Sequence, residues 1–137
     1  MKNNLHTFSI VARDSTSKQL GVAIQSHWFA VGSLCPWVEA GVSAIATQSL
    51  VRVSYGPQGL NLLRSGKSAF DVLQQLLSAD DNRESRQVAI VDAQGNIAAH
   101  TGKKCIAEAG HYIGDGFSVQ ANMMTNSRVW PAMANAF

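Results

Sequence analysis

The clearest pattern near the start of the chain is an alternation of apolar and polar positions. Residues 7–14 and residues 20–27 each place an apolar side chain at every second position, which is typical of half-buried strands. Residues 14–18, between them, are all polar, so the pattern predicts an antiparallel hairpin. In the first strand Phe8, Ile10 and Ala12 share one face, and the other face carries Thr7, Ser9, Val11 and Arg13.

A third strand is expected after an irregular segment. Residues 28–39 contain Gly32 and Pro36 and predict a loop. Residues 41–48 predict a strand built of small residues, which indicates that another element packs closely on it.

The pattern then changes to helical spacing. Apolar residues bunch at residues 59–65, Pro57 suits a first helical turn, and Gly66 is placed to end the helix. A second helix is expected directly afterwards, with Ser68 as its N-cap. Asp71 lies near the positive end of that helix dipole, and the expected core-facing stripe is Phe70, Leu73, Leu76 and Leu77.

Alternation returns in the second half of the chain. Residues 87–92 and 96–101 flank a turn with Gly95 and predict a second hairpin. After a glycine-punctuated stretch in which residues 114–116 form a turn, residues 117–121 predict a short strand. A final helix is indicated by the spacing of Val129, Met133 and Phe137.

Strands, two helices and then strands predict a mixed antiparallel α+β fold in which helices cover one face of the sheets. The 137 residues correspond to about one domain. Hydrophobic residues make up 46% of the chain and charged residues 15%, which favours a folded chain with a sizeable core.

Charge and cysteine usage exclude several classes of function. The net charge is +2 and the charges are scattered, so the chain lacks the basic stripe of nucleic-acid-binding proteins, and we expect no nucleic-acid partner. It has no run of about 18 apolar residues and no apolar stretch at its start, so we expect no membrane partner and a cytoplasmic location. Cys35 and Cys105 lack the spacing of a zinc site or a disulfide framework and are expected to be ordinary thiols.

Polar side chains gather where the predicted strands end, and strand ends are where rigid folds present functional groups. Taken singly, such a residue more often satisfies backbone groups or faces water. The cluster as a whole suggests a site and consists of Thr7, Ser9, Ser26, His27, Thr47, Gln48, Asp92, His100, Thr101 and Asn122.

Three familiar kinds of site lack their signatures. A serine triad could use the histidines with Asp14 or Asp92, but the chain has no G-x-S-x-G elbow. The histidines are far apart and form no H-E-x-x-H pair, so no metal is expected. Residues 114–116 lack the glycine and lysine of a phosphate loop. A hydrolase that uses His27 or His100 remains an alternative.

A fourth mechanism places the nucleophile at the start of the chain. A threonine that becomes the first residue attacks a carbonyl with its hydroxyl, while its α-amine, with a pKa near about 8, acts as the base. Thr7 opens the first predicted strand. This chemistry requires cleavage of the bond between His6 and Thr7, because an amide nitrogen is not basic.

Seven motifs follow one another in the order of a known family. They are T-F-S-I-V-A-R-D at 7–14, L-G-V-A-I-Q-S-H-W-F-A-V-G at 20–32, A-T-Q-S at 46–49, Y-G-P-Q-G-L at 55–60, R-Q-V-A-I-V-D-A-Q-G at 86–95, H-T-G at 100–102 and Q-A-N-M-M at 120–124. Over residues 7–137 the chain closely resembles the prokaryotic family called domain of unknown function 1028 (DUF1028). That family is placed in the N-terminal nucleophile (Ntn) hydrolase-like superfamily.

The resemblance implies an αββα sandwich and hydrolysis of an amide bond, with Thr7 as the catalytic nucleophile. We expect a small amide or peptide as substrate and neither a cofactor nor a metal. The substrate-binding residues that it suggests lie in the family motifs and are Ser26, His27, Gln48, His100, Thr101 and Asn122.

Two features depart from the usual family pattern. Residues 1–6 precede Thr7 as an N-terminal extension of the domain at residues 7–137. Relatives usually continue with further strands, so we expect the sandwich to be incomplete at the C-terminus, with an exposed sheet edge and apolar face.

The main hypothesis is therefore an Ntn-type amidohydrolase that becomes active when residues 1–6 are removed. The alternative is a non-catalytic binding or structural module on the same fold. A homo-oligomer is expected in either case, because aromatic residues in or beside irregular segments often anchor interfaces, although the same residues also suit core packing. These residues are Trp28, Phe29, Trp37 and Trp130.

Overall fold

The computed structural model describes residues 6–137, so residues 1–5 of the expected extension lie outside the described residues. The fold is α+β, with two four-stranded antiparallel sheets and three helices. The first sheet has the order β2-β1-β8-β7 and consists of β1 (Thr7–Arg13), β2 (Leu20–Ser26), β7 (Gly110–Gly114) and β8 (Phe117–Asn122). The second has the order β3-β4-β5-β6 and consists of β3 (Pro36–Glu39), β4 (Ser43–Ser49), β5 (Arg86–Asp92) and β6 (Ile97–Thr101).

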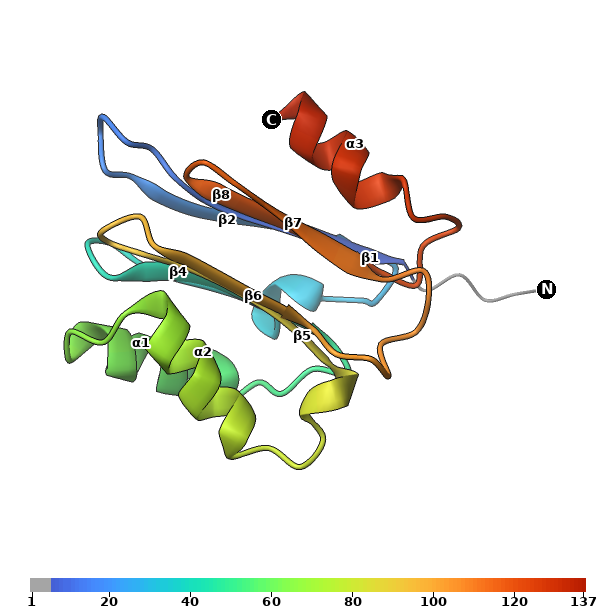
Figure 1. Ribbon diagram of the computed structural model, residues 1–137, viewed down its shortest axis with the longest axis horizontal. Coiled ribbons are helices and arrows are strands. Elements are labelled where there is room, and N and C mark those ends of the chain that lie inside the picture. The colour runs from blue at the N-terminus through green and yellow to red at the C-terminus, as the bar shows by residue number, and fades with distance from the viewer. Residues whose placement is uncertain (1–5) are drawn as a thin grey trace.

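The two sheets lie face to face, with helices on both outer sides (Figure 1). Helices α1 (Tyr55–Arg64) and α2 (Ala69–Ser78) cover the second sheet, and α3 (Val129–Ala136) covers β7 and β8 of the first. Short 3₁₀ turns, η1 (Val31–Ser33) and η2 (Arg83–Ser85), lie in the connections. The order of layers is thus helix, sheet, sheet, helix. None of the helices in residues 6–137 is long and apolar enough to cross a membrane.

Several predictions that rest on local pattern are confirmed. β1 pairs with β2 and β5 with β6 as antiparallel hairpins. The Ser68 hydroxyl accepts a hydrogen bond from the Asp71 amide at the start of α2, as an N-cap does. Gly66, just after α1, has a positive φ of 91°, which glycine adopts without steric strain.

Two strands were not predicted. β3 lies within the segment expected to be a loop, and β7 lies within the glycine-punctuated stretch. Both are short edge strands, and each pairs on one side only. They were missed because β3 begins with a proline and β7 begins and ends with a glycine, and both residue types are depleted in strands.

The prediction for Phe70 was wrong. Its side chain is 62% exposed, whereas the core-facing stripe of α2 is Ala69, Val72, Leu73, Leu76 and Leu77. These five positions follow the i, i+3, i+4, i+7, i+8 spacing of one helix face, and Phe70 lies beside that face. The small-residue strand β4 does carry a close neighbour, because a Cβ on Gly59 of α1 would lie 2.8 Å from Ile45 Cδ1.

Candidate functional site

The layer between the two sheets changes character along the strands. One end, here called the apolar end, consists of Val11, Ala44, Ala46, Ala89 and Val91. The other, here called the polar end, consists of Ser9, Gln48, Gln87, Thr101, Gln120 and Asn122. In β1, β4 and β5 the inward side chains thus pass from apolar to polar within one strand.

Hydrogen bonds in the polar end connect the two sheets. The Ser9 hydroxyl on β1 donates to Gln48 Oε1 on β4 at 2.7 Å and accepts from Gln120 Nε2 on β8 at 2.7 Å. Gln48 Nε2 in turn donates to Gln87 Oε1 on β5 at 2.8 Å. All four side chains are almost completely buried, so each depends on its protein partners rather than on water.

Gln87 is the centre of this network. Its Oε1 also accepts from Asn122 Nδ2 at 2.9 Å, and its Nε2 donates to Thr101 Oγ1 at 2.9 Å and to the Ala121 carbonyl at 2.9 Å. The Thr101 hydroxyl lies 2.8 Å from His111 Nδ1. Burial, and secondly the nearby charge of His100, lower the pKa of His111, so its imidazole is neutral at pH 7 and can accept from Thr101.

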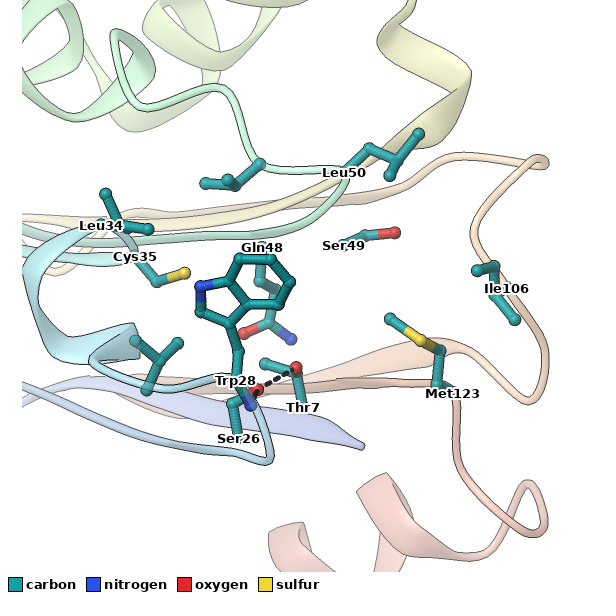
Figure 2. Close-up of a pocket in the computed structure, with 12 residues that line it drawn as sticks. Thr7, Ser26, Trp28, Leu34, Cys35, Gln48, Ser49, Leu50, Ile106 and Met123 are labelled. Carbon is teal, nitrogen blue, oxygen red and sulfur yellow. Dashed lines mark hydrogen bonds between the residues drawn. The ribbon is translucent and has the colours of Figure 1, made fainter. Parts of the chain in front are cut away.

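A pocket of about 450 Å³ lies beside the polar end (Figure 2). Thr7, the first residue of β1, points its hydroxyl into it, and Thr7 Oγ1 lies 2.8 Å from Ser26 Oγ on the neighbouring strand. Ser26 Oγ also accepts from the Trp28 amide at 3.0 Å, which fixes its position. Gln48 forms the inner wall of the pocket, so the wall is held rigid by the network.

Two pocket residues have unusual backbone conformations. Ser49 is the last residue of β4, and Met123 directly follows β8. Their φ values are 69° and 58°. Non-glycine residues with positive φ are strained, and such residues cluster at functional sites. Both observations support a functional role for the pocket.

The pocket brings no strong base to Thr7. Its lining includes no Asp, Glu, His, Lys or Arg from residues 6–137. Cys35 also lines it, but burial raises the pKa of this thiol to about 11, so it stays protonated at neutral pH. A reaction at the Thr7 hydroxyl therefore needs a base other than the side chains that line the pocket.

The bond that precedes Thr7 lies at the edge of the site. The His6 carbonyl accepts from the His27 amide at 3.1 Å, and His6 Nδ1 lies 2.7 Å from the Met123 carbonyl. While this bond is intact, the Thr7 nitrogen is an amide and has no basic lone pair.

The chain matches the model of the Family of unknown function (DUF1028) over residues 7–137. The chain belongs to the DUF1028 family. A similar solved structure is that of protein SPO2555 from Silicibacter pomeroyi, described as a crystal structure of a DUF1028 protein, with a TM-score of 0.90 and 29% sequence identity. The match covers 96% of this chain and 58% of that one, so this chain spans less than two thirds of that relative's length. No curated protein matches it significantly.

In this DUF1028 chain the residues expected at the site lie in three places: in the pocket, in the polar end, and outside both. Thr7, Ser26 and Gln48 line one pocket. Asn122 is paired with Thr7 across β1 and β8, and both Asn122 and Thr101 belong to the polar end. The buried Asn122 Oδ1 has no hydrogen-bond partner among the described residues, so the site holds one free acceptor.

The two expected histidines lie elsewhere. His27 follows Ser26 but is exposed and does not line the pocket. His100 Nε2 lies 2.9 Å from the Arg83 carbonyl, also outside the pocket lining. Within residues 6–137, no group of three His, Cys, Asp or Glu side chains is placed to hold a metal ion.

Several members of the site were not predicted. Gln87 and Gln120 occupy inward positions of buried strands, and Trp28, Cys35, Ser49 and Ile106 line the pocket. A signal for the first two was present, because a long amide side chain in register with buried apolar residues must find partners inside the protein.

Of the four aromatic residues proposed as interface anchors, two pack internally and two are exposed. Trp37 packs on Gly56 of α1, and Trp130 of α3 packs on Gly110. Trp28 is 61% and Phe29 is 93% exposed. A homo-oligomer that buries Trp28 and Phe29 remains a prediction.

Proposed function

We propose that this protein is an Ntn-type amidohydrolase that cleaves a small amide or peptide, with Thr7 as both nucleophile and base after removal of residues 1–6. The observation that carries the proposal is the Thr7 hydroxyl in a formed pocket whose described side chains offer it no base. A threonine in such a place becomes reactive when its own α-amine is free, because the amine is then in the same residue as the hydroxyl.

Two further observations support the proposal. The family match begins at Thr7, the residue that would carry the free amine. The helix, sheet, sheet, helix layering agrees with the αββα sandwich expected from the resemblance to the Ntn hydrolase-like superfamily. Fold alone does not define chemistry, so the pocket carries more weight than the layering.

The proposed reaction balances with Thr7 alone as the acid–base group. The free amine takes the hydroxyl proton as Thr7 Oγ1 attacks the amide carbon, and the resulting ammonium then protonates the leaving nitrogen. Water attacks the remaining ester in the same way, which releases the acid and restores the threonine. Ser26 orients the hydroxyl through the 2.8 Å contact between their oxygens.

The test compares chains that differ only before or at Thr7. One chain begins at Thr7, a second carries a single glycine before Thr7, and a third begins at Thr7→Val, which keeps the shape and removes the hydroxyl. We expect the first to hydrolyse a panel of uncharged p-nitroanilides at least about 1,000-fold faster than the other two. Its rate should rise with pH through about 8 as the amine loses its proton.

Intact mass and thermal unfolding of each chain provide the controls. Equal hydrolysis by the Thr7→Val chain, which lacks the nucleophilic hydroxyl, or by a chain that still begins at Met1, which lacks a free amine at Thr7, contradicts the proposal. A correctly processed, folded chain that cleaves none of the anilides favours the alternative, a non-catalytic binding or structural module. That alternative draws its support from the same pocket, whose mostly apolar lining can hold a ligand without a reaction.

A further inference from the structure

The walls of the Thr7 pocket are mostly apolar. Beyond Thr7, Ser26, Gln48 and Ser49, the lining consists of Cys35 and hydrophobic side chains that include Trp28, Val31, Leu34, Leu50, Ile106 and Met123. Three of these are largely exposed for hydrophobic residues: Trp28 at 61%, Leu50 at 60% and Ile106 at 57%. Apolar surface of this kind around a pocket mouth favours an apolar occupant, because binding removes it from water.

The polar groups of the pocket have little hydrogen-bonding capacity left. Gln48 uses its Oε1 on Ser9 and its Nε2 on Gln87, and Ser26 Oγ is engaged by Thr7 and by the Trp28 amide. The Thr7 and Ser49 hydroxyls can still bind a substrate carbonyl. With two such hydroxyls in an otherwise apolar pocket, the lining suits a substrate whose only polar group is an amide.

A charged substrate group would find no side-chain counter-charge in this pocket, and the Thr7 α-amine must itself be uncharged to act as the base. None of the described residues in its lining is acidic or basic. Burying a carboxylate or an ammonium without a partner costs several kcal/mol, whereas burying an alkyl or aryl group is favourable. The chemistry of the lining therefore discriminates by charge.

The apolar walls lie on both sides of the nucleophile. Figure 2 shows Leu34 and Cys35 to one side of the Thr7 hydroxyl and Ile106 and Met123 to the other, with Gln48 behind it. A volume of about 450 Å³ lies within the range of pockets for small molecules. An amide carbonyl held at Thr7 thus has apolar surface on both its acyl side and its amine side.

From these observations we infer that the substrate is an uncharged amide with apolar groups on both sides of the bond that is cleaved. This inference rests on the proposed function for its reaction and on the pocket lining for its selectivity. Substrates with a carboxylate or an ammonium near that bond are excluded.

Three anilides of equal length test the selectivity. They are hexanoyl-p-nitroanilide, the mono-p-nitroanilide of adipic acid, which ends in a carboxylate, and 6-aminohexanoyl-p-nitroanilide, which ends in an ammonium. With the chain that begins at Thr7, we expect kcat/KM for the hexanoyl compound to exceed that of either charged compound by at least about 100-fold. Comparable values for a charged compound overturn the inference while leaving the proposed reaction intact.

Binding is measured separately, so that a failure of catalysis does not hide the selectivity. The full chain with Thr7→Ala is titrated with hexananilide, adipic acid monoanilide and 6-aminohexananilide, and Trp28 in the pocket reports occupancy by its fluorescence. We expect a saturable fluorescence change with hexananilide, which is absent in Trp28→Leu because that variant removes the reporter, and at least about 100-fold weaker binding of the charged anilides. Selective binding without hydrolysis supports the inference and counts against the proposed function. Absence of saturable binding by all three overturns the inference.

A charge placed in the pocket should weaken the preference for the uncharged compound. In Leu34→Arg the guanidinium can pair with the carboxylate of the adipic compound, so its binding should improve at least about 10-fold relative to that of hexananilide. Val38→Arg is the matched control, because Val38 is 52% exposed and lies outside the pocket lining. An equal gain in Val38→Arg points to the net charge of the protein and contradicts a role for the pocket. Thermal unfolding shows that both variants are folded.

Discussion

The polar end and the apolar end lie in the same layer between the same two sheets, yet they are held together differently. At the apolar end, Val11 packs against alanine and valine side chains of β4 and β5, and each contact is small and non-directional. At the polar end, buried amides and hydroxyls are joined by hydrogen bonds of defined length and direction. The apolar contacts hold the two sheets together, and the hydrogen bonds of the polar end also fix the positions of particular atoms.

The difference matters because the pocket lies beside the polar end. Gln48 belongs both to the network and to the pocket wall, and Asn122 is paired with Thr7 across β1 and β8. An apolar layer would bring the sheets together equally well without constraining side chains to one orientation. The network thus holds the surroundings of Thr7 in place, which a preformed site requires.

The largest effect on the free energy of unfolding is expected when a polar residue of the polar end is replaced by an apolar one. The matched substitution at the apolar end replaces an apolar residue by a polar one. Gln87→Met keeps the volume but leaves the Gln48 and Asn122 amides without their acceptor, so we expect a loss of about 4 kcal/mol in the free energy of unfolding. Val91→Thr, the matched exchange at the apolar end, introduces one buried hydroxyl and should cost about 2 kcal/mol. Urea unfolding at pH 7 measures both. If Gln87→Met costs less than Val91→Thr, the contrast between the two ends is wrong.

A somewhat smaller loss of stability is expected when a buried charged group is removed. The polar end contains no such group, but Asp80 is one. Asp80, next to α2, accepts from Arg86 Nε and from Tyr55 Oη, each at 2.8 Å. The Arg86 hydrogen bond is the main reason that the pKa of Asp80 lies far below its usual range. Because the pKa is lower in the folded state, the carboxylate stabilises the fold above about pH 4, and this stabilisation is lost as the pH falls further.

Asp80→Asn should therefore cost about 3 kcal/mol at pH 7 and progressively less below about pH 4. Urea unfolding of both proteins at pH 7, 5 and 3 provides the measurement. Gln87→Met is the control, since it removes no carboxylate, and its cost should stay nearly constant over the same range. A cost for Asp80→Asn that does not change with pH would contradict the role given to the Asp80 carboxylate.

The smallest effect is expected from His111, which borders the polar end. Its pKa is lowered in the folded protein, chiefly by burial, so the unfolded chain binds the proton more readily. The free energy of unfolding should then fall as the pH drops below about 6.5. His111→Asn should flatten this dependence between pH 7.5 and 5.5, whereas the exposed His27→Asn control should keep it. An unchanged slope in His111→Asn shows that another group is responsible.

The sequence predicted the parts of the fold that depend on near neighbours. The two hairpins, the Ser68 cap and the turn at Gly66 each follow from a few consecutive residues, and each is present. The strands β3 and β7 were missed because their proline and glycines indicate loops locally, and only pairing with β4 and β8 makes them strands. The exposure of Phe70 was missed because the orientation of α2 is fixed by the sheet beneath it.

The candidate site was predicted less completely than the fold. Thr7 came from the family resemblance and from the chemistry of a chain-terminal threonine, and Ser26 and Gln48 came from the family motifs. Trp28, Cys35 and Ile106 gave no signal as pocket residues, because a lining is defined by the space between elements. The two histidines that sequence reasoning favoured lie outside that lining.

What the sequence determined by itself is the order of the three helices and of every strand except β3 and β7, the Ser68 cap, the turn at Gly66, and membership of residues 7–137 in one family. The tertiary structure alone decided which polar side chains meet. Ser9 bonds to Gln48, 39 positions away, and to Gln120, 111 positions away. The physical reason is that periodicity and capping act over a few residues. A buried hydrogen-bond network and an apolar pocket exist only once two sheets pack face to face.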